Sequence, residues 1–163
     1  MNRNREIIVK GIGKSSIAPD LIIIEMKLET IDLQYEKTMN KASELIEILR
    51  SAFISIGFNG NDLKTLHFNI NAKYERYKIK DEWKERFLGY SCLHNLKLEL
   101  GLDMSKLGTT LNAISKCNVK PQLNIKFSIK DSSKISEKLL QDAIENARLK
   151  AKVLSEAAGV IVD

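Results

Sequence analysis

The pattern that most constrains the fold is the alternation of apolar and polar residues over residues 86–101. The residues expected on one face of this stretch are Leu88, Tyr90, Cys92, His94, Leu96, Leu98 and Leu100. Because successive side chains of a strand point to opposite faces, a period of two predicts a β-strand with one buried face. Residues 65–78 alternate in the same way and predict its antiparallel partner. The link between the two strands, KIKDEWKE, is polar, and we expect it to be mobile.

Near the N-terminus, two apolar runs flank a segment that contains glycine. Residues 6–12 and 20–31 are rich in Ile and Val, which predicts two further strands. The second run has one apolar face, formed by Ile22, Ile24, Met26 and Leu28. Gly11 and Gly13 would permit a bulge or a tight turn between these strands.

Three segments have the apolar spacing of helices. Residues 34–56 repeat apolar side chains at helical intervals, and Gly57 follows as a stop. Asp103 is the expected N-cap of a helix over residues 104–117. A last helix is expected to start at residue 131 and run to Ala158. Its apolar stripe is rich in alanine, which predicts close packing on a sheet or on another helix.

The order of these elements indicates the fold class. Alternation after Pro121 predicts one more strand, which gives the order β-β-α-β-β-α-β-α. This order predicts an α+β fold with a largely antiparallel sheet of about five strands and helices packed on one face. The length of 163 residues suits a single domain over residues 1–163. The final VIVD, residues 160–163, resembles the start of a strand, so we expect a natural chain that continues past Asp163 or a short strand that closes the sheet edge.

The charge, the cysteine count and the hydropathy limit the classes of protein to which this chain can belong. Lys and Arg number 26 against 21 Asp and Glu, and a net charge of +5 is diagnostic of neither nucleic-acid nor lipid binding. Cys92 and Cys117 are too few for a disulfide scaffold and match no zinc spacing, so we expect free thiols in a reducing compartment. The N-terminus has no apolar signal region, and no apolar run could span a bilayer. We therefore expect a cytoplasmic protein, or an exported one if a leader segment had been removed.

No group of residues in the sequence predicts catalysis. GIGKSS, residues 11–16, has Ser16 where a dinucleotide loop has its third glycine, and a strand rather than a helix is predicted after it. His67 and His94, with Cys92, suggest a metal or nucleophile site, but such a site needs a third ligand or an orienting group. A core histidine bonded to a backbone group is the preferred interpretation. We expect no enzyme activity, no cofactor and no metal.

The link and the strand ends beside it carry the strongest candidate for an interaction surface. Four aromatic residues lie there, Tyr74, Tyr77, Trp83 and Phe87, and they are expected to dock on a neighbouring subunit. Three interleaved lysines, Lys78, Lys80 and Lys84, are the expected contacts for an anion. Basic and aromatic side chains together can hold phosphates and stack bases, but nearby acidic residues dilute the charge.

Several short motifs follow one another in an order that resembles a known family. They are IIVKGIG (7–13), Pro19-Asp20, Gly57 with Asp62-Leu63-Lys64-Thr65, Tyr74, Gly89-Tyr90, Leu107-Gly108, Phe127-Ser128-Ile129 with Asp131, and the alanine–lysine helix ending at Gly159. Together they resemble the SIMPL domain family, a group largely of unknown function. The resemblance covers nearly the whole chain.

The resemblance implies an α+β fold and, for some relatives, ring-like or channel-like homo-oligomers. Many bacterial relatives are exported, and members usually continue with a further strand after the last glycine. The family has no established catalytic residues. We therefore expect an uncharacterised SIMPL-like domain that self-assembles or binds proteins and is not an enzyme. The alternative is a module that binds nucleic acid or an anionic surface through residues 73–87.

Overall fold

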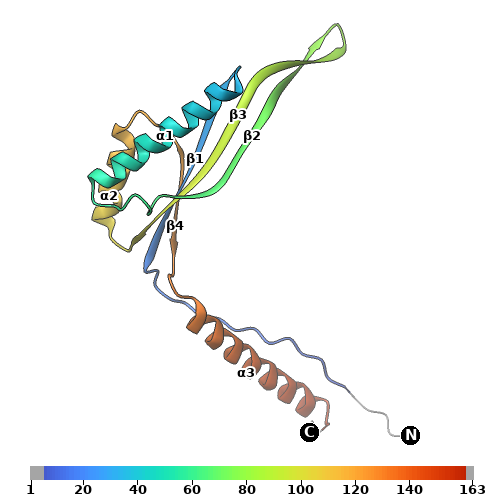
Figure 1. Cartoon of the computed structure of the whole chain (residues 1–163). Coiled ribbons are helices and arrows are strands. Elements are labelled where there is room, and N and C mark those ends of the chain that lie inside the picture. Colours follow the sequence, from blue (N-terminus) through green and yellow to red (C-terminus); the bar gives the residue numbers. More distant parts are fainter. Residues whose placement is uncertain (1–5, 161–163) are drawn as a thin grey trace. The chain divides into compact units, whose positions relative to one another are not determined.

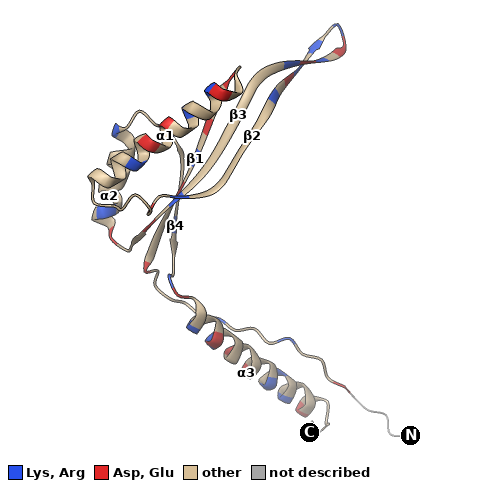
Figure 2. Ribbon diagram, viewed as in Figure 1, with Lys and Arg blue, Asp and Glu red and all other residues tan. Residues whose placement is uncertain are grey.

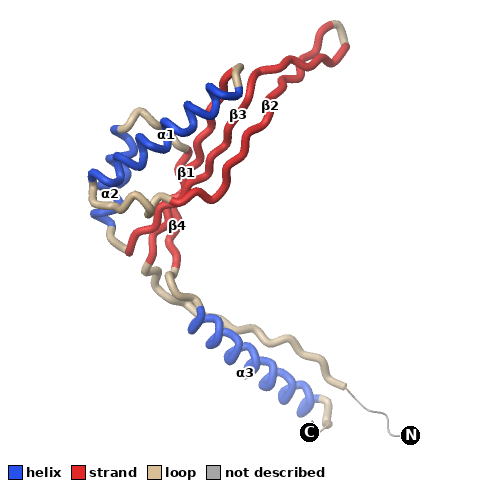
Figure 3. Tube along the Cα trace, in the orientation of Figure 1, coloured by secondary structure: helices blue, strands red, loops and turns tan. Residues whose placement is uncertain are grey.

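The structure is a computed structural model that describes residues 6–160. The chain divides into two compact units. Residues 19–128 form the first, the sheet unit, and of the described residues 6–18 and 129–160 form the second, the helix unit. Figure 3 shows that all the strands belong to the sheet unit, whereas the helix unit pairs a helix with an extended segment.

The sheet unit contains four strands and two helices. In chain order they are β1 (Leu21–Asp32), α1 (Tyr35–Ser55), β2 (Lys64–Ile79), β3 (Glu82–Gly101), α2 (Met104–Lys116) and β4 (Gln122–Ser128). The strand order is β2-β3-β1-β4, and every neighbouring pair is antiparallel (Figure 1). This β-α-β-β-α-β order is that of a ferredoxin-like fold. The predicted α+β class with an antiparallel sheet is confirmed, with four strands in the described residues rather than about five.

The core lies between one face of the sheet and helices α1 and α2, as predicted (Figure 1). The strands contribute the fully buried side chains of Ile22, Ile24 and Leu98, and α1 contributes Leu49 and Phe53. Each such side chain stabilises the fold by about 1.5–3 kcal/mol relative to an exposed position. The opposite face of the sheet has no helix of this unit on it, which matches the polar residues that alternate with the apolar ones.

Two of the predicted helix boundaries have the expected local chemistry. The Asp103 carboxylate accepts a hydrogen bond from the Lys106 N–H at 2.9 Å and caps the start of α2. After α1, Gly57 adopts φ of +94°, a conformation that glycine reaches without a steric penalty.

The helix unit contains α3 (Ser133–Ala157) and an extended segment, residues 6–18. The prediction of a strand over residues 6–12 is wrong, because this segment lies along α3 and pairs with no strand in the described part of the chain (Figure 1). Gly11 approaches the backbone at Ala143, and Gly13 approaches the backbone at Leu139. The glycines thus allow close packing on a helix instead of a turn between strands.

Hydrogen bonds hold the extended segment to α3. The Ile12 N–H donates to Asn146 Oδ1 at 3.1 Å, and the Lys150 ammonium donates to the Lys10 carbonyl at 2.8 Å. The alanine stripe was predicted to pack on a sheet or on another helix, but at Ala143 and Ala147 it packs against the extended segment instead. The strand predicted at residues 160–163 falls mostly outside the described residues. Within residues 6–160, no helix has the length and apolar character needed to cross a membrane.

Candidate interaction surface on the β2–β3 ribbon

Strands β2 and β3 extend well beyond the rest of the sheet as a two-stranded ribbon (Figure 1). Strand β1 pairs with β3 only from Tyr90 onward. Among the strands that the structure describes, residues 73–79 of β2 and 82–89 of β3 therefore pair only with each other, and we call residues 73–89 the ribbon. A two-stranded hairpin alone in water is marginally stable, so the ribbon depends on its own side-chain contacts.

A two-residue turn closes the ribbon. Lys80 and Asp81 have φ of +47° and +66°, as both central residues of a type I′ turn do. The predicted extent of the link, KIKDEWKE, is therefore wrong, because most of that stretch belongs to the two strands. The period-two pattern is hidden there by the charged residues that occupy both faces.

A β-bulge at the base of the ribbon changes which side chains share a face. Lys73 pairs with Gly89, but Tyr74 pairs with Phe87, so Leu88 is the extra residue. Gly89 has φ of +133°, and a Cβ atom there would lie 2.5 Å from the Asp32 carbonyl oxygen. Because of the bulge, Phe87 lies on the same face as Tyr90.

Four aromatic rings run along this face from the sheet into the ribbon, and we call them the aromatic ladder. Tyr35, at the start of α1, meets Tyr90 with ring centroids 5.4 Å apart. Tyr90 meets Phe87 at 5.4 Å, and Phe87 meets Tyr74 at 5.5 Å. All three contacts are edge-to-face, a geometry that adds about 0.5–1.5 kcal/mol per pair. The ladder fixes the base of the ribbon to α1.

The structure separates the four predicted interface aromatics. Tyr74, Phe87 and Trp83 lie on the ladder face, since Trp83 pairs with Lys78 and Tyr74 with Phe87. Tyr77 pairs with Lys84 and lies on the opposite face, where the Arg86 guanidinium stands 5.9 Å from its ring centroid. Trp83 is 70% exposed, and with Arg76 and Glu85 it lines a shallow hollow of about 430 Å³.

Basic and acidic residues both occur along the ribbon (Figure 2), and ion pairs neutralise most of their charges. Arg76 pairs with Glu85 at 2.7 Å, and Arg86 pairs with Glu75. Of the three lysines predicted to bind an anion, Lys78 pairs with Asp81 at 2.6 Å. Lys80 lies in the turn and Lys84 on the face opposite Lys78, so the structure does not bring the three together.

The histidines lie on opposite faces of the sheet, because Phe68 is the partner of His94 whereas His67 is the partner of Asn95. The His94 Nε2 lies 2.8 Å from Thr65 Oγ1, and Nδ1 is buried with no partner among the described residues. The predicted core position of His94 is confirmed, but its bond goes to a side chain instead of the backbone.

Burial lowers the pKa of His94 and raises the pKa of the buried Cys92 thiol. No group of three or more His, Cys, Asp or Glu residues able to hold a metal occurs in residues 6–160.

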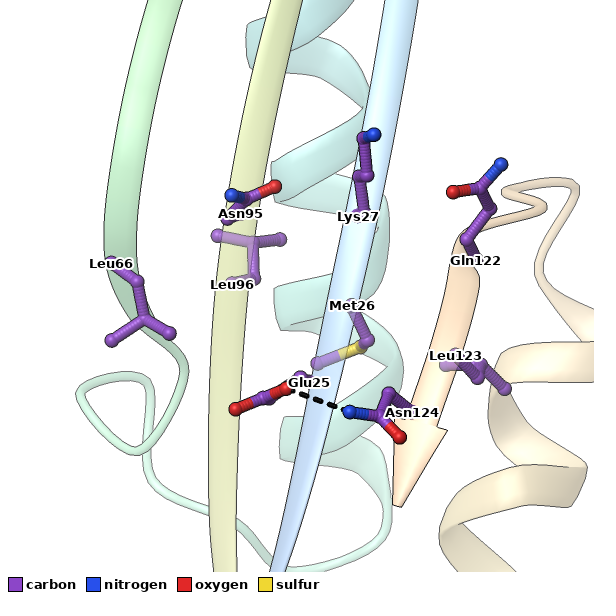
Figure 4. A pocket seen from close by; sticks show the side chains of 9 residues that line it. All are labelled: Glu25, Met26, Lys27, Leu66, Asn95, Leu96, Gln122, Leu123 and Asn124. Atoms are coloured by element: carbon purple, nitrogen blue, oxygen red, sulfur yellow. Dashed lines mark hydrogen bonds between the residues drawn. The ribbon is translucent and has the colours of Figure 1, made fainter. Parts of the chain in front are cut away.

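The open face of the sheet has a hollow of about 450 Å³, lined by both polar and apolar residues, that the sequence did not predict (Figure 4). Its lining residues include Glu25, Lys27, Asn95, Gln122 and Asn124. The Glu25 carboxylate accepts hydrogen bonds from Lys126 at 2.6 Å and from Asn124 at 3.0 Å, which lowers the pKa of Glu25 and keeps it ionised. Because its charge is already satisfied by these partners, Glu25 is a poor candidate for an acid or base.

Sequence reasoning does not identify Tyr35 and Tyr90 as part of the candidate surface. The period-two pattern includes Tyr90 in the alternating residues of β3. The pattern does not indicate that a bulge brings Tyr90 and Phe87 onto the same face. Gly89 is the one available signal, because an isolated glycine within a strand pattern often marks a bulge.

Comparison with known proteins gives one family and two curated relatives. Residues 7–163 match the family model SIMPL, described as a protein of unknown function (DUF541). The "26 kDa periplasmic immunogenic protein" of Brucella melitensis biotype 1 is 25% identical over 155 residues, which cover 94% of this chain and 62% of the relative. The protein of that name from Brucella abortus strain S19 is 24% identical with the same coverage. The chain thus spans about three fifths of the length of these relatives.

Solved structures with a similar arrangement are distant in sequence. GlnK of B. subtilis has 8% identity and a TM-score of 0.38, covering 66% of this chain and 84% of that one. CutA1 of Ehrlichia chaffeensis has 12% identity and a TM-score of 0.26, covering 77% and 96%. Likenesses this weak say nothing about the function of the chain.

Proposed function

This chain belongs to the SIMPL family of proteins of unknown function, and we propose that it is a non-enzymatic module that self-assembles through the ladder face of the ribbon. The observation that carries the proposal is the exposure of Trp83 on a projecting, hydrogen-bonded ribbon. Large aromatic side chains that are exposed in a monomer are the usual anchors of protein interfaces.

The surroundings of Trp83 support a protein partner. Tyr74, on the same face, is 58% exposed, and the Arg76–Glu85 ion pair lies between it and Trp83. This ion pair already neutralises its own charges. A face that combines exposed aromatic rings with a paired charge is suited to a second protein surface and less suited to a polyanion.

The arrangement of the titratable groups supports a role other than catalysis. His94 is buried against the Thr65 hydroxyl, and no carboxylate of the described residues binds its Nδ1 to orient the ring. His67 lies on the other face of the sheet. Nucleophilic catalysis needs a nucleophile, a base and an orienting group within hydrogen-bond reach of one another.

The names of the two Brucella relatives favour export over the cytoplasmic location expected from the N-terminus, since both are called periplasmic. We therefore propose that the protein acts outside the cytoplasm. Fractionation of cells that express the complete natural gene would test this. Recovery in the cytoplasmic fraction would contradict the proposal.

The interface is tested by Trp83→Ala, with Tyr77→Ala as the matched control. Both changes remove an aromatic ring from the same ribbon, but Trp83 lies on the ladder face and Tyr77 on the opposite one. We expect Trp83→Ala to weaken self-association at least tenfold, because an interface anchor contributes roughly 2 kcal/mol or more. Sedimentation velocity over a concentration series measures this effect.

The same measurement can contradict the proposal in two ways. A wild-type protein that stays monomeric at the highest concentrations would exclude self-assembly. Equal effects of Trp83→Ala and Tyr77→Ala would exclude the ladder face as the contact surface. The unfolding curve of Trp83→Ala should match the wild type, because Trp83 is mostly exposed.

A further inference from the structure

Strand β4 leaves part of the core face of the sheet uncovered. Leu123 pairs with Met26 and Phe127 pairs with Ile22, and both of these β1 residues are buried. Leu123 and Phe127 are nevertheless 43% and 51% exposed. Two large apolar side chains thus extend the buried face of the sheet beyond the helices that cover it.

The same strand has an unpaired edge. In the strand order β2-β3-β1-β4, strand β4 has β1 on one side and no strand of the described residues on the other. Its outward N–H and C=O groups form a template for another extended strand. The occupant of this edge must therefore supply backbone hydrogen bonds and, on the helix side, apolar side chains that cover Leu123 and Phe127.

We propose that the occupant is β4 of a second copy of this chain, paired antiparallel about a two-fold axis at Ile125. In this register Leu123 faces Phe127 of the second copy, and Ile125 faces its own counterpart. Since the axis is two-fold, the contact between Leu123 and Phe127 forms twice, once on each side of the axis. The two sheets become one continuous sheet of eight strands.

The polar face of β4 is compatible with the same register. Asn124 comes to face Lys126 of the second copy, and Gln122 faces Ser128. Within β4, residues 122–128, no two like charges stand directly opposite each other, an arrangement that would oppose pairing. Lys126 also keeps its ion pair with Glu25 at 2.6 Å, so its charge is balanced within each copy. A strand of this length is therefore self-complementary on both faces.

This inference rests on the proposed function, because it takes self-assembly to be the role of the protein. It assigns a second contact to a surface other than the ribbon. The ribbon and the β4 edge lie at opposite edges of the sheet, because β2 and β4 are its two edge strands. A chain with two separate self-association surfaces can build assemblies larger than a dimer.

The test is a charge-pair experiment made in protein that carries Trp83→Ala, so that the ribbon contact is removed. Leu123→Lys alone and Phe127→Glu alone each place a charge against an apolar side chain of the second copy. We expect each to weaken dimerisation at least tenfold. An equimolar mixture of the two should dimerise again, since the introduced lysine then faces the introduced glutamate, and the unchanged Phe127 faces the unchanged Leu123. Sedimentation velocity and native mass spectrometry of the mixture measure the recovery.

The controls separate the two surfaces and guard against unfolding. Gln122→Lys adds a charge on the polar face of the same strand and should leave the dimer intact. Thermal unfolding verifies that each variant is folded. Monomeric Trp83→Ala protein at the highest concentration, dimers in both single variants, or a mixture that stays monomeric would each overturn the β4 pairing. Failure of the ribbon proposal is a separate result, namely that Trp83→Ala leaves the association of the otherwise unchanged protein unaltered.

Discussion

Gly11 lies directly against the main chain of Ala143, so that a Cβ atom at Gly11 would stand 1.8 Å from the Ala143 carbonyl oxygen. Such a distance is far shorter than any contact between unbonded atoms, so a side chain at residue 11 can fit only if the extended segment moves away from α3. The hydrogen bond from the Ile12 N–H to Asn146 lies one residue further on and depends on the same approach.

We predict that Gly11→Ala detaches the extended segment from α3 at a cost of about 1–3 kcal/mol, the usual range for an added methylene in a packed site. Hydrogen exchange of the Ile12 amide should become faster.

Gly108→Ala is the control, because Gly108 lies within α2 and a Cβ there would meet no atom within 4 Å. That variant should be as stable as the wild type or up to about 1 kcal/mol more stable, since alanine favours helices. Unchanged exchange at Ile12 in Gly11→Ala protein would contradict the packing described.

Stability should fall at acidic pH because of His94. Burial holds the pKa of His94 in the folded protein below its ordinary value of 6.5. The unfolded chain therefore takes up a proton first as the pH drops. The stability present above pH 6.5 is lost between that value and the lower pKa of the folded state. Chemical denaturation over a pH series that runs from above to below this window measures the loss.

The variant His94→Leu should flatten this part of the pH profile, because the titrating group is removed. His67→Gln is the control, since it removes an imidazole from the opposite, exposed face of the sheet. A wild-type slope that persists in His94→Leu protein would assign the acid sensitivity to another group.

The turn of the ribbon should accept a stabilising substitution. Lys80 and Asp81 both have positive φ, a conformation that Asn and Gly adopt more readily. We expect the pair of changes Lys80→Asn and Asp81→Gly to stabilise the ribbon by about 1 kcal/mol, even though the exposed Lys78–Asp81 ion pair is lost. Slower amide exchange of residues 76–85 would verify the gain. Faster exchange would show that the ion pair outweighs the turn geometry.

The two cysteines should react at very different rates. Cys92 is 1% exposed and its thiol pKa is raised by burial, whereas Cys117 is only partly buried. A thiol reagent at mildly alkaline pH should modify Cys117 on the order of 100-fold faster than Cys92, which becomes accessible only when the sheet opens. In Cys117→Ser protein the fast phase should vanish. A fast phase that survives this change would place Cys92 at the surface.

The regular parts of the fold were predictable because local pattern and tertiary contact agree there. The alternation over residues 92–100 indicates the buried face of β3, and Asp103 marks the start of α2. The strand prediction for residues 6–12 failed because β-branched residues favour any extended conformation, including one that lies on a helix. Only the distant contact at Ala143 distinguishes the two cases.

The candidate surface was predictable in composition but not in arrangement. The aromatic residues of the ribbon are evident in the sequence, yet their division between two faces depends on the pairing of Tyr74 with Phe87. That pairing is set by the bulge at Leu88, which the alternation pattern alone does not reveal. The link to α1 through Tyr90 and Tyr35 likewise requires three-dimensional contacts.

The bulge at Leu88 also determines which side chains of β3 lie on each face of the ribbon. Beyond Tyr90 the orientation of β3 is fixed by its pairing with β1, whereas within the ribbon the orientation depends on the single extra residue. Deleting or inserting one residue at this point would exchange the two faces of β3 in the ribbon and leave the core untouched. A gene could therefore change the surface that the ribbon presents, and with it the choice of partner, by gaining or losing one codon.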